Sequence, residues 1–341
     1  MKRFSLRPLF AILVAAGTIS AYSDRTAPTA TSRSSDRADG PANRSDEPFE
    51  VGRFTTVDVP GATATRLFAI NDAGVAVGRY ESGGRTHGFV RSVTGELATI
   101  DFPGAGFTAA GALNNRGDIV GWYTLPAAST VRHGFLLRDG QFSTFDPPGS
   151  TFTNALGIND RGDIVGRFCT KSACREPGNG DFHGFLLRDA EFTILDVPGS
   201  FETNAWKIND RSEIVGGFGI GGEVELFLLR NGEFTTFAIP NGLPLSEDNG
   251  GINARGDIVG RYCDVSPCRA GPMGHGFLLS GGALTTIDVP GAVGTGTFGI
   301  NGRREVVGGY YDAANVLHGY VMQLERREGQ EDREAVRRSP F

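Results

Sequence analysis

The segments GINDRGDIVGRF (residues 157–168) and HGFLLRDA (residues 183–190) decide the fold. Both contain short apolar runs bounded by turn sequences, Asp160-Arg161-Gly162 in the first and Asp189-Ala190 in the second. Short apolar runs bounded by such turns are typical of β-strands, and short turns between strands give hairpins. The segments and their flanks therefore predict strands over residues 153–159, 163–168, 183–188 and 191–197.

The same unit recurs six times along the chain. Its proline recurs at Pro60, Pro103, Pro148, Pro198, Pro240 and Pro290, and its asparagine at Asn71, Asn114, Asn159, Asn209, Asn253 and Asn301. Repeats of about 40 to 50 residues that contain short alternating strands are typical of propeller blades. The sequence thus predicts an all-β, six-bladed β-propeller of four-stranded antiparallel blades. The repeats start near residues 54, 97, 142, 192, 234 and 284.

The first and last repeats are incomplete. The chain enters the repeats with a strand of the outer type at 54–59 and leaves them with a strand of the third type at 318–323. An open array would expose unpaired strand edges, which are a hazard for aggregation. We therefore expect these two strands to pair, which completes a blade and closes the ring. Inner strands should also crowd the axis, where small residues recur: Ala69, Ala112, Gly157, Gly251 and Gly299.

The histidines support closure. All five occupy the same repeat position, and counting across the hairpin turns places each opposite an aspartate. The predicted pairs are His87–Asp101, His133–Asp146, His183–Asp196, His275–Asp288 and His318–Asp58. The last pair joins the two ends of the chain. The fourth repeat has Glu225 and Ala238 in place of the pair. Because equivalent positions in different blades cannot converge on one substrate, we interpret the pairs as structural cross-strand contacts, not as catalytic or metal-binding groups.

The His-Gly-Phe and His-Gly-Tyr segments resemble the HAF repeat family, whose bacterial repeats are named for a His-Ala-Phe signature. The resemblance covers residues 54–323 and departs from the signature at its middle letter. It implies a location outside the cell. It implies no activity and no catalytic residue.

The two ends of the chain differ in character from the repeats. Residues 1–21 have a basic start, a short apolar stretch and a small final residue, which is typical of a secretory signal. Residues 22–50 are polar and predict a disordered leader, and the charged residues 324–341 predict a flexible tail. The folded part is expected at 51–323. No later stretch is apolar enough to span a membrane, and the net charge of −6 argues against binding nucleic acid. We predict a secreted or periplasmic monomer.

The four cysteines form two C-x₄-C pairs, Cys169 with Cys174 and Cys263 with Cys268. A four-cysteine zinc site would have to join two repeats that are not neighbours, and zinc sites commonly show C-x₂-C spacing. In an exported protein two local disulfides fit better. No metal site or cofactor motif is predicted.

Variation in length is confined to the loops at one end of the blades: 125–132, 169–182, 241–249 and 263–274. The fourth repeat also departs from the consensus, because it places Lys207 where the others have glycine or alanine, with Trp206 beside it. Lys171, Arg175, Arg269 and Glu223 lie in the loops around this repeat. Loops on a rigid scaffold commonly carry binding sites. We interpret this sector as an anion or glycan pocket; the alternative is repeat drift, with Lys207 filling a wet channel.

The predicted function is therefore an exported, non-catalytic binding module for an extracellular or envelope protein or glycan. Its binding face is expected at the variable loops around repeats three to five, and no catalytic residue is named. The alternative is a secreted carboxylate-based glycosidase or lyase, which needs two acids at a suitable separation. The acids available to it are Glu202, Glu223, Glu247 and Asp248. A passive structural repeat protein is a third possibility.

Overall fold

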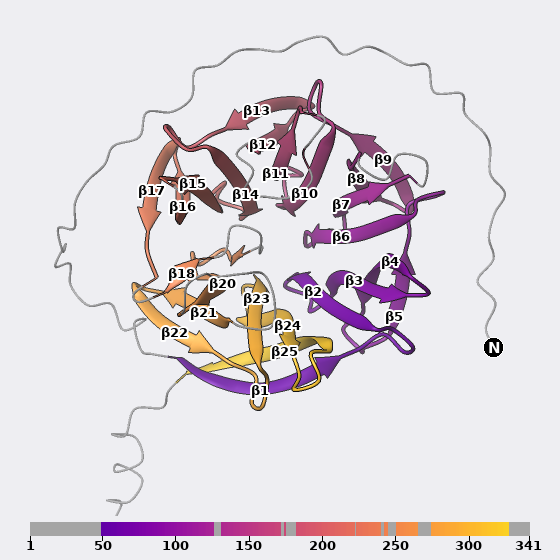
Figure 1. Cartoon of the computed structure of the whole chain (residues 1–341), viewed down its shortest axis with the longest axis vertical. Coiled ribbons are helices and arrows are strands. Elements are labelled where there is room, and N and C mark those ends of the chain that lie inside the picture. The colour runs from indigo at the N-terminus through magenta and orange to yellow at the C-terminus, as the bar shows by residue number, and fades with distance from the viewer. Residues whose placement is uncertain are drawn as a thin grey trace, which may run out of the picture.

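The structure is a computed structural model that describes residues 49–125, 131–171, 174, 182–221, 223–239, 242–244, 250–264 and 274–326. All regular secondary structure in these residues is β-strand, and the sheets are arranged around a central axis (Figure 1). The fold is an all-β propeller.

Each repeat forms strands in the order inner to outer. The first two repeats contain β2 (Ala64–Ile70), β3 (Ala76–Ser82), β4 (Arg85–Arg91), β5 (Leu97–Ile100), β6 (Phe107–Leu113), β7 (Ile119–Thr124), β8 (His133–Arg138) and β9 (Gln141–Phe145). The next two contain β10 (Phe152–Ile158), β11 (Ile164–Cys169), β12 (His183–Arg188), β13 (Glu191–Leu195), β14 (Glu202–Ile208), β15 (Ile214–Ile220), β16 (Glu223–Arg230) and β17 (Glu233–Phe237). The remaining strands are β18 (Leu243–Pro244), β19 (Gly251–Ile252), β20 (Ile258–Cys263), β21 (His275–Ser280), β22 (Ala283–Ile287), β23 (Gly294–Ile300), β24 (Glu305–Tyr311), β25 (Leu317–Arg326) and, from the start of the chain, β1 (Phe49–Val57).

The hydrogen-bonded sheets do not all correspond to single repeats. Three sheets have four strands: β10–β13, β14–β17, and β23–β25 with β1. A five-stranded sheet contains β18–β22, because β18 and β19 both pair with β20. An eight-stranded sheet contains β2–β5 and β6–β9, which are joined by one parallel pair between Thr86 and Phe107. The sheets therefore number five among the described residues, where the sequence predicts six separate blades, because this single pair links two repeats.

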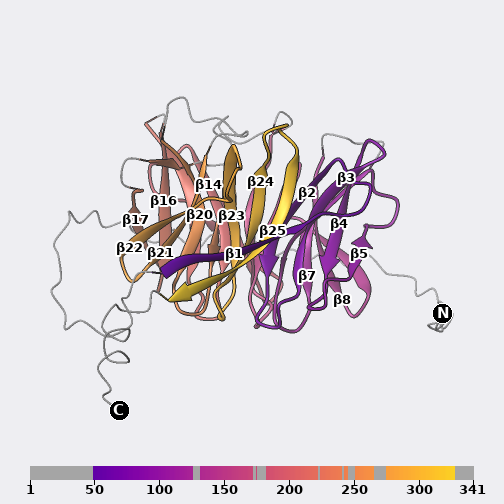
Figure 2. The same ribbon diagram turned by 90° about the horizontal axis from the view of Figure 1, so that it is seen from below.

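The two ends of the chain share one sheet (Figure 2). β1 pairs antiparallel with β25 from Phe49 opposite Arg326 to Val57 opposite Gly319. The predicted pairing of the terminal strands is confirmed. Both strands are longer than predicted. In β25, Leu324 is buried and its N–H donates to the carbonyl of Arg304 at 3.1 Å. Residues 49–50 thus belong to a strand and not to the leader, and residues 324–326 belong to a strand and not to the tail.

The consensus V-G-x-Y and H-G-F segments form the packing between the second and third strands. The aromatic residue of H-G-F or its equivalent is at most 1% exposed in every repeat: Phe89, Phe135, Phe185, Phe227, Phe277 and Tyr320. Its ring lies over the glycine of the neighbouring strand. A Cβ atom on Gly166, for example, would approach the ring of Phe185 to 2.7 Å. Glycine is therefore needed at this position to admit the aromatic ring.

The inner strands crowd the axis as the small residues predict. Five inner strands share a register shift at the same repeat position, at Leu67/Ala69, Ala110/Ala112, Ala155/Gly157, Ala205/Lys207 and Thr297/Gly299. Such bulges bend and twist a strand. A Cβ on Gly157 would lie 2.9 Å from the Cα of Lys207, and one on Gly299 would lie 2.8 Å from the Cα of Ala69. Neighbouring backbones therefore leave no room for larger side chains there.

A ring of hydrogen bonds links the repeats at the end of the axis where the tight turns lie. The amide Nδ2 of each consensus asparagine donates to the backbone carbonyl of the next one, at 2.9–3.3 Å, in the cycle Asn71, Asn114, Asn159, Asn209, Asn253, Asn301 and back to Asn71. The Oδ1 atom folds the local turn, since in Asn159 it accepts from the N–H groups of Arg161 and Asp163, both at 3.0 Å. The asparagine of the consensus N-x-R-G-D therefore has two roles: its Oδ1 atom forms the local turn, and its Nδ2 atom bonds the next repeat.

Candidate functional site

The axis opens at the turn end into a cavity of about 80 Å³, which we call the rim cavity. Its walls are the triplets 70–72, 113–115, 158–160, 208–210, 252–254 and 300–302. Polar groups of neighbouring turns hydrogen-bond to one another along the rim. The N–H of Asp72 donates to Asn115 Oδ1 at 2.8 Å, and the N–H of Asn115 donates to Asp160 Oδ1 at 2.7 Å. No group of three or more metal-ligating side chains is present among the described residues.

Lys207 lies deeper on the axis. It lines a second cavity of about 70 Å³ whose other walls are small or aliphatic residues: Ala69, Ile70, Ala112, Leu113, Ile158, Ile208, Gly251, Ile252, Gly299 and Ile300. Its ammonium group donates to the carbonyl of Leu156 at 2.6 Å and to that of Gly111 at 3.3 Å. Burial lowers the pKa of Lys207 from 10.5 to about 7, since an apolar environment disfavours the charged amine. The side chain thus points to the axis as predicted, but it is 7% exposed and already holds two acceptors.

Trp206 does not share that cavity. Its ring is 3% exposed and packs between repeats, so that a Cβ on Gly217 would lie 2.7 Å from it and one on Gly250 would lie 2.9 Å from it. The ring belongs to a core cluster with Phe68 and Trp122. Trp206 is therefore a core residue in this structure, which differs from the ligand contact that the sequence suggests.

The other predicted pocket residues are only partly described. Lys171 is exposed, at the start of the loop that follows β11. Arg175 and Arg269 lie outside the described residues, as do Glu247 and Asp248, and the side chain of Glu223 is not described. Of the acids named for the enzyme alternative, Glu202 is the one with a described side chain, and it is 2% exposed.

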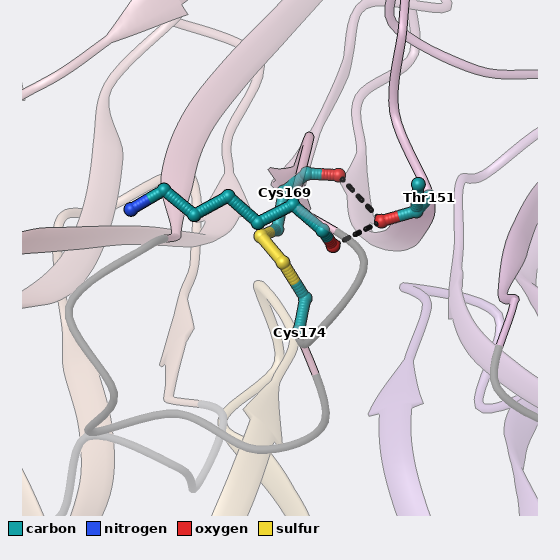
Figure 3. The surroundings of a disulfide bond; sticks show 4 residues. Thr151, Cys169 and Cys174 are labelled. Carbon is teal, nitrogen blue, oxygen red and sulfur yellow. Dashed lines mark hydrogen bonds between the residues drawn. A yellow bond between two sulfur atoms is a disulfide. The ribbon is translucent and has the colours of Figure 1, made fainter.

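One predicted disulfide is confirmed between Cys169 and Cys174, with a Cα–Cα distance of 6.2 Å (Figure 3). The hydroxyl of Thr151 donates to the carbonyl of Lys171 at 2.6 Å and to that of Cys169 at 3.4 Å, which ties the start of the loop to the segment before β10. Cys263 is also disulfide-bonded, and its expected partner Cys268 lies outside the described residues.

The five predicted His–Asp contacts all form. In each pair the histidine Nδ1 lies 2.7–2.9 Å from a carboxylate oxygen, in His87–Asp101, His133–Asp146, His183–Asp196, His275–Asp288 and His318–Asp58. An aromatic residue on the second strand packs on the histidine, as Tyr80 does on His87 with ring centroids 5.0 Å apart. The hydroxyl of Tyr80 continues the contact to Thr99 at 2.8 Å. Each contact stays within one sheet and therefore forms no shared site.

The cationic side chains that sequence reasoning missed lie at the opposite, loop end of the axis. They occupy the x position of V-G-x-Y, which is Arg79, Trp122, Arg167, Gly217, Arg261 and Gly309 in successive repeats. Arg167 is 8% exposed and donates from Nη1 to Asn204 Oδ1 at 3.2 Å, and Arg261 is 6% exposed. The alternation of arginine with other residues at this position was the signal that could have found them.

Two asparagines beside these arginines have unpaired polar atoms. Asn154, 1% exposed, pairs in register with Arg167, and Asn204 is completely buried. Asn154 Oδ1 and Asn204 Nδ2 have no hydrogen-bond partner within the part of the chain that the structure describes. Buried polar atoms are normally paired with protein or water, so these two atoms are unusual in this fold.

No family model matches the chain, and no curated protein matches it. Among solved structures it is similar to the β-propeller domain of the Trilobed protease from Pyrococcus furiosus, at 11% identity over 79% of this chain and 84% of that chain, with a TM-score of 0.50. It is also similar to virginiamycin B lyase from Staphylococcus aureus, at 14% identity over 79% and 88% of the two chains, with a TM-score of 0.42. At this level of identity the likeness to the protease domain shows the propeller fold alone. No helix in the described ranges is long and apolar enough to cross a membrane.

Proposed function

We propose that this chain is an exported, non-catalytic binding module whose ligand, an extracellular or envelope protein or glycan, binds at the loop end of the propeller axis. The disulfide between Cys169 and Cys174 supports a secreted or periplasmic location, because such bonds persist in oxidising compartments. The secretory signal predicted at residues 1–21 and the resemblance to the HAF repeats point the same way.

We also infer that the ring has six blades. The eight-stranded sheet counts as two blades in this view, since among the described strands its halves are paired at one position, Thr86 opposite Phe107. The asparagine ring supports the count, because it passes once through each of the six repeats before returning to its start at Asn71.

The observation that carries the binding proposal is the pair of unsatisfied atoms on Asn154 and Asn204. An unpaired buried polar group costs about 1–3 kcal/mol, so a fold keeps one only where something repays that cost. Both residues are on inner strands, at the end where the variable loops leave the sheets. A bound partner that donates to Asn154 and accepts from Asn204 would satisfy both.

The enzyme alternative has less support. A glycosidase needs two carboxyl groups about 5–9.5 Å apart, one of them placed to protonate the leaving group. Glu202 is buried, and so are the arginines Arg167 and Arg261 at the loop end. A cationic environment favours holding a ligand over donating a proton from a neutral acid.

The test is a glycan array probed with purified chain starting at residue 22, with a parallel assay for released sugar or unsaturated product. We expect retention of a defined class of glycan without turnover, and loss of retention in Asn204→Leu at a temperature where that variant is still folded, because it also loses the bond from Arg167. Arg53→Met, at an exposed side chain on the outer strand β1, is the matched control. Product formation would establish the enzyme alternative, and retention of neither glycan nor envelope protein by folded chain would leave a structural role.

A further inference from the structure

Lys207 brings a charged side chain to an inner-strand position where the other repeats have a small residue. The equivalent residues are Ala69, Ala112, Gly157, Gly251 and Gly299. Since those repeats pack around the axis without a long side chain, closure of the ring does not require the lysine. Its ammonium group reaches two other repeats, where it donates to the carbonyls of Leu156 on β10 and Gly111 on β6. Backbone atoms therefore hold the ammonium group in place.

The charged form of Lys207 is only partly satisfied by these contacts. An ammonium group has three N–H donors, and two of them have carbonyl acceptors here. Within the ranges that the structure describes, Lys207 has no third acceptor and no ion-pair partner. A buried charge without a counter-charge is costly, and a small anion would supply both the acceptor and the charge.

The cavity that Lys207 lines has room for such an anion. Its volume is about 70 Å³, and no other lining residue has a polar or titratable side chain. A protein cavity of about 150 Å³ holds benzene, so about half that volume suits a molecule of about three or four non-hydrogen atoms. Formate and acetate have this size, and the methyl group of acetate also suits an aliphatic wall.

This cavity adjoins the rim cavity at the turn end of the axis. The two cavities share one aliphatic wall residue from each repeat: Ile70, Leu113, Ile158, Ile208, Ile252 and Ile300. The walls of the rim cavity also contain Asp72, Asp160 and Asp210. These carboxylates repel negative charge, so a ligand that enters from the turn end should carry a single charge and not two.

We propose that Lys207 binds a short monocarboxylate, formate or acetate, in the cavity on the axis. The carboxylate group pairs with the ammonium group of Lys207, and the methyl group of acetate packs on the aliphatic wall. This site uses none of the residues that carry the binding proposed for the loop end. Either proposal can therefore fail without the other.

Binding should depend on pH through Lys207. Burial lowers the pKa of Lys207 to about 7, and no charged side chain contributes to this shift. The charged or titratable groups on the strands that line the cavity or pack against β14, and on β14 itself, are Arg66, Arg167, His183, Arg188 and Glu202. Above about pH 7 the amine is neutral and must take up a proton when the anion binds, so the affinity should fall roughly tenfold per pH unit.

The test is an NMR titration of the ¹⁵N-labelled chain from residue 22 with sodium acetate at about pH 6 and constant ionic strength, followed at the indole signals of Trp122 and Trp206. We expect saturable binding with a dissociation constant on the order of 1 mM, as suits so small a ligand. Lys207→Met removes the charge at similar side-chain volume and should weaken binding at least ~tenfold. Arg53→Met is the matched control, because it removes a charge at an exposed position of β1, and it should bind like the wild type.

Two further ligands test the chemistry of the site. Acetamide has the size of acetate without its charge, and benzoate has a carboxylate on a ring too large for the cavity. Both should bind at least ~tenfold more weakly than acetate. Acetamide or benzoate binding as tightly as acetate would overturn the proposal, since the first needs no cation and the second does not fit the cavity.

Three results with acetate itself would also overturn the site: no saturable binding by the wild type, equal binding by Lys207→Met, or an affinity unchanged between about pH 6 and pH 9. Should Lys207→Met not fold, the pH profile of the wild type decides the question. None of these results bears on retention of a glycan at the loop end, which the array measures separately.

Discussion

The side-chain amide of Asn301 donates to the backbone carbonyl of Asn71 at 2.9 Å, across 230 positions of the sequence. This bond completes the asparagine ring near the axis, while β1 and β25 pair in an outer sheet. The first and last repeats are thus joined at two distances from the axis by two different kinds of contact. Loss of one should leave the other in place.

Asn159→Ala should destabilise the fold by about 2–4 kcal/mol, since it removes two acceptor bonds that form a turn and leaves buried N–H groups unpaired. Asn159 also bonds the carboxylate of Asp163 at 2.9 Å. Urea denaturation measures the change. The control is Asn115→Ala on the exposed rim. Its loss in free energy of unfolding should be less than half that of Asn159→Ala. Equal losses would show that the asparagine ring stabilises the fold no more than the exposed rim does.

The pair His318–Asp58 should make closure depend on pH. Burial disfavours the charged imidazole, but the hydrogen bonds and charges of Asp58 and Asp312 outweigh it and raise the pKa of His318 above 6.5. A raised pKa means that the contact contributes fully below pH 6.5 and that its contribution is lost as pH rises through the folded value. Asp58→Asn should therefore reduce stability more at about pH 5.5 than at about pH 9.

Asp196→Asn is the matched control for this pair, because His183 and Asp196 lie on two strands already joined by a hairpin. That variant should weaken its sheet without opening the ring, so limited proteolysis should release β1 only in Asp58→Asn. A stability loss for Asp58→Asn that grows with pH would contradict the role assigned to His318.

The disulfide between Cys169 and Cys174 should stabilise locally, by about 2 kcal/mol, because it closes a short loop. Non-reducing peptide mapping should recover this bond and a second one between Cys263 and Cys268. Reduction should raise hydrogen exchange around Thr151, whose hydroxyl holds the loop, while the strand amides stay protected. Four free thiols, or loss of the whole sheet structure on reduction, would refute this assignment.

Lys207 should give the protein a rising stability between about pH 7 and pH 10. Its pKa is lowered from 10.5 to about 7 by burial, so the unfolded chain binds one more proton than the folded chain in that range. Relative to Lys207→Met, the free energy of unfolding of the wild type should rise by a few kcal/mol as pH rises through this window. Below pH 7 the folded chain carries the buried charge in full, so its destabilising effect is largest there. Denaturation at several pH values checks this, with Lys171→Met as the exposed control. A pH-independent difference would mean that Lys207 is solvated.

Sequence predicted the contacts whose geometry is local. The predicted turn Asp189-Ala190 has φ values of 51° and 63°, as a two-residue hairpin requires. The His–Asp contacts follow from counting across such turns. The closure of the ring followed from the unmatched His318 and Asp58 at the two ends.

What sequence missed depends on packing between repeats. The consensus shows an arginine at position 79 of the first repeat, but not that Arg66 lies opposite it, because that pairing depends on the register between β2 and β3. Trp206 looked like a ligand contact because it stands beside Lys207, yet the bulge in β14 lies between Ala205 and Lys207 and the indole packs between repeats. The aliphatic neighbours of Lys207 on the axis are likewise assembled from several repeats.

The pairing of Phe49 with Arg326 has a consequence for how the chain folds. Among the described strands β1 comes first along the chain, and its partner β25 comes last. The intervening strands can form their local hairpins quickly, but the final sheet must wait for contacts of very large sequence separation, which are the slowest to form. Until then β1 carries an unsatisfied edge. Folding should therefore end in one late, cooperative step, and a chain that stalls before β25 should be the form that chaperones and proteases recognise.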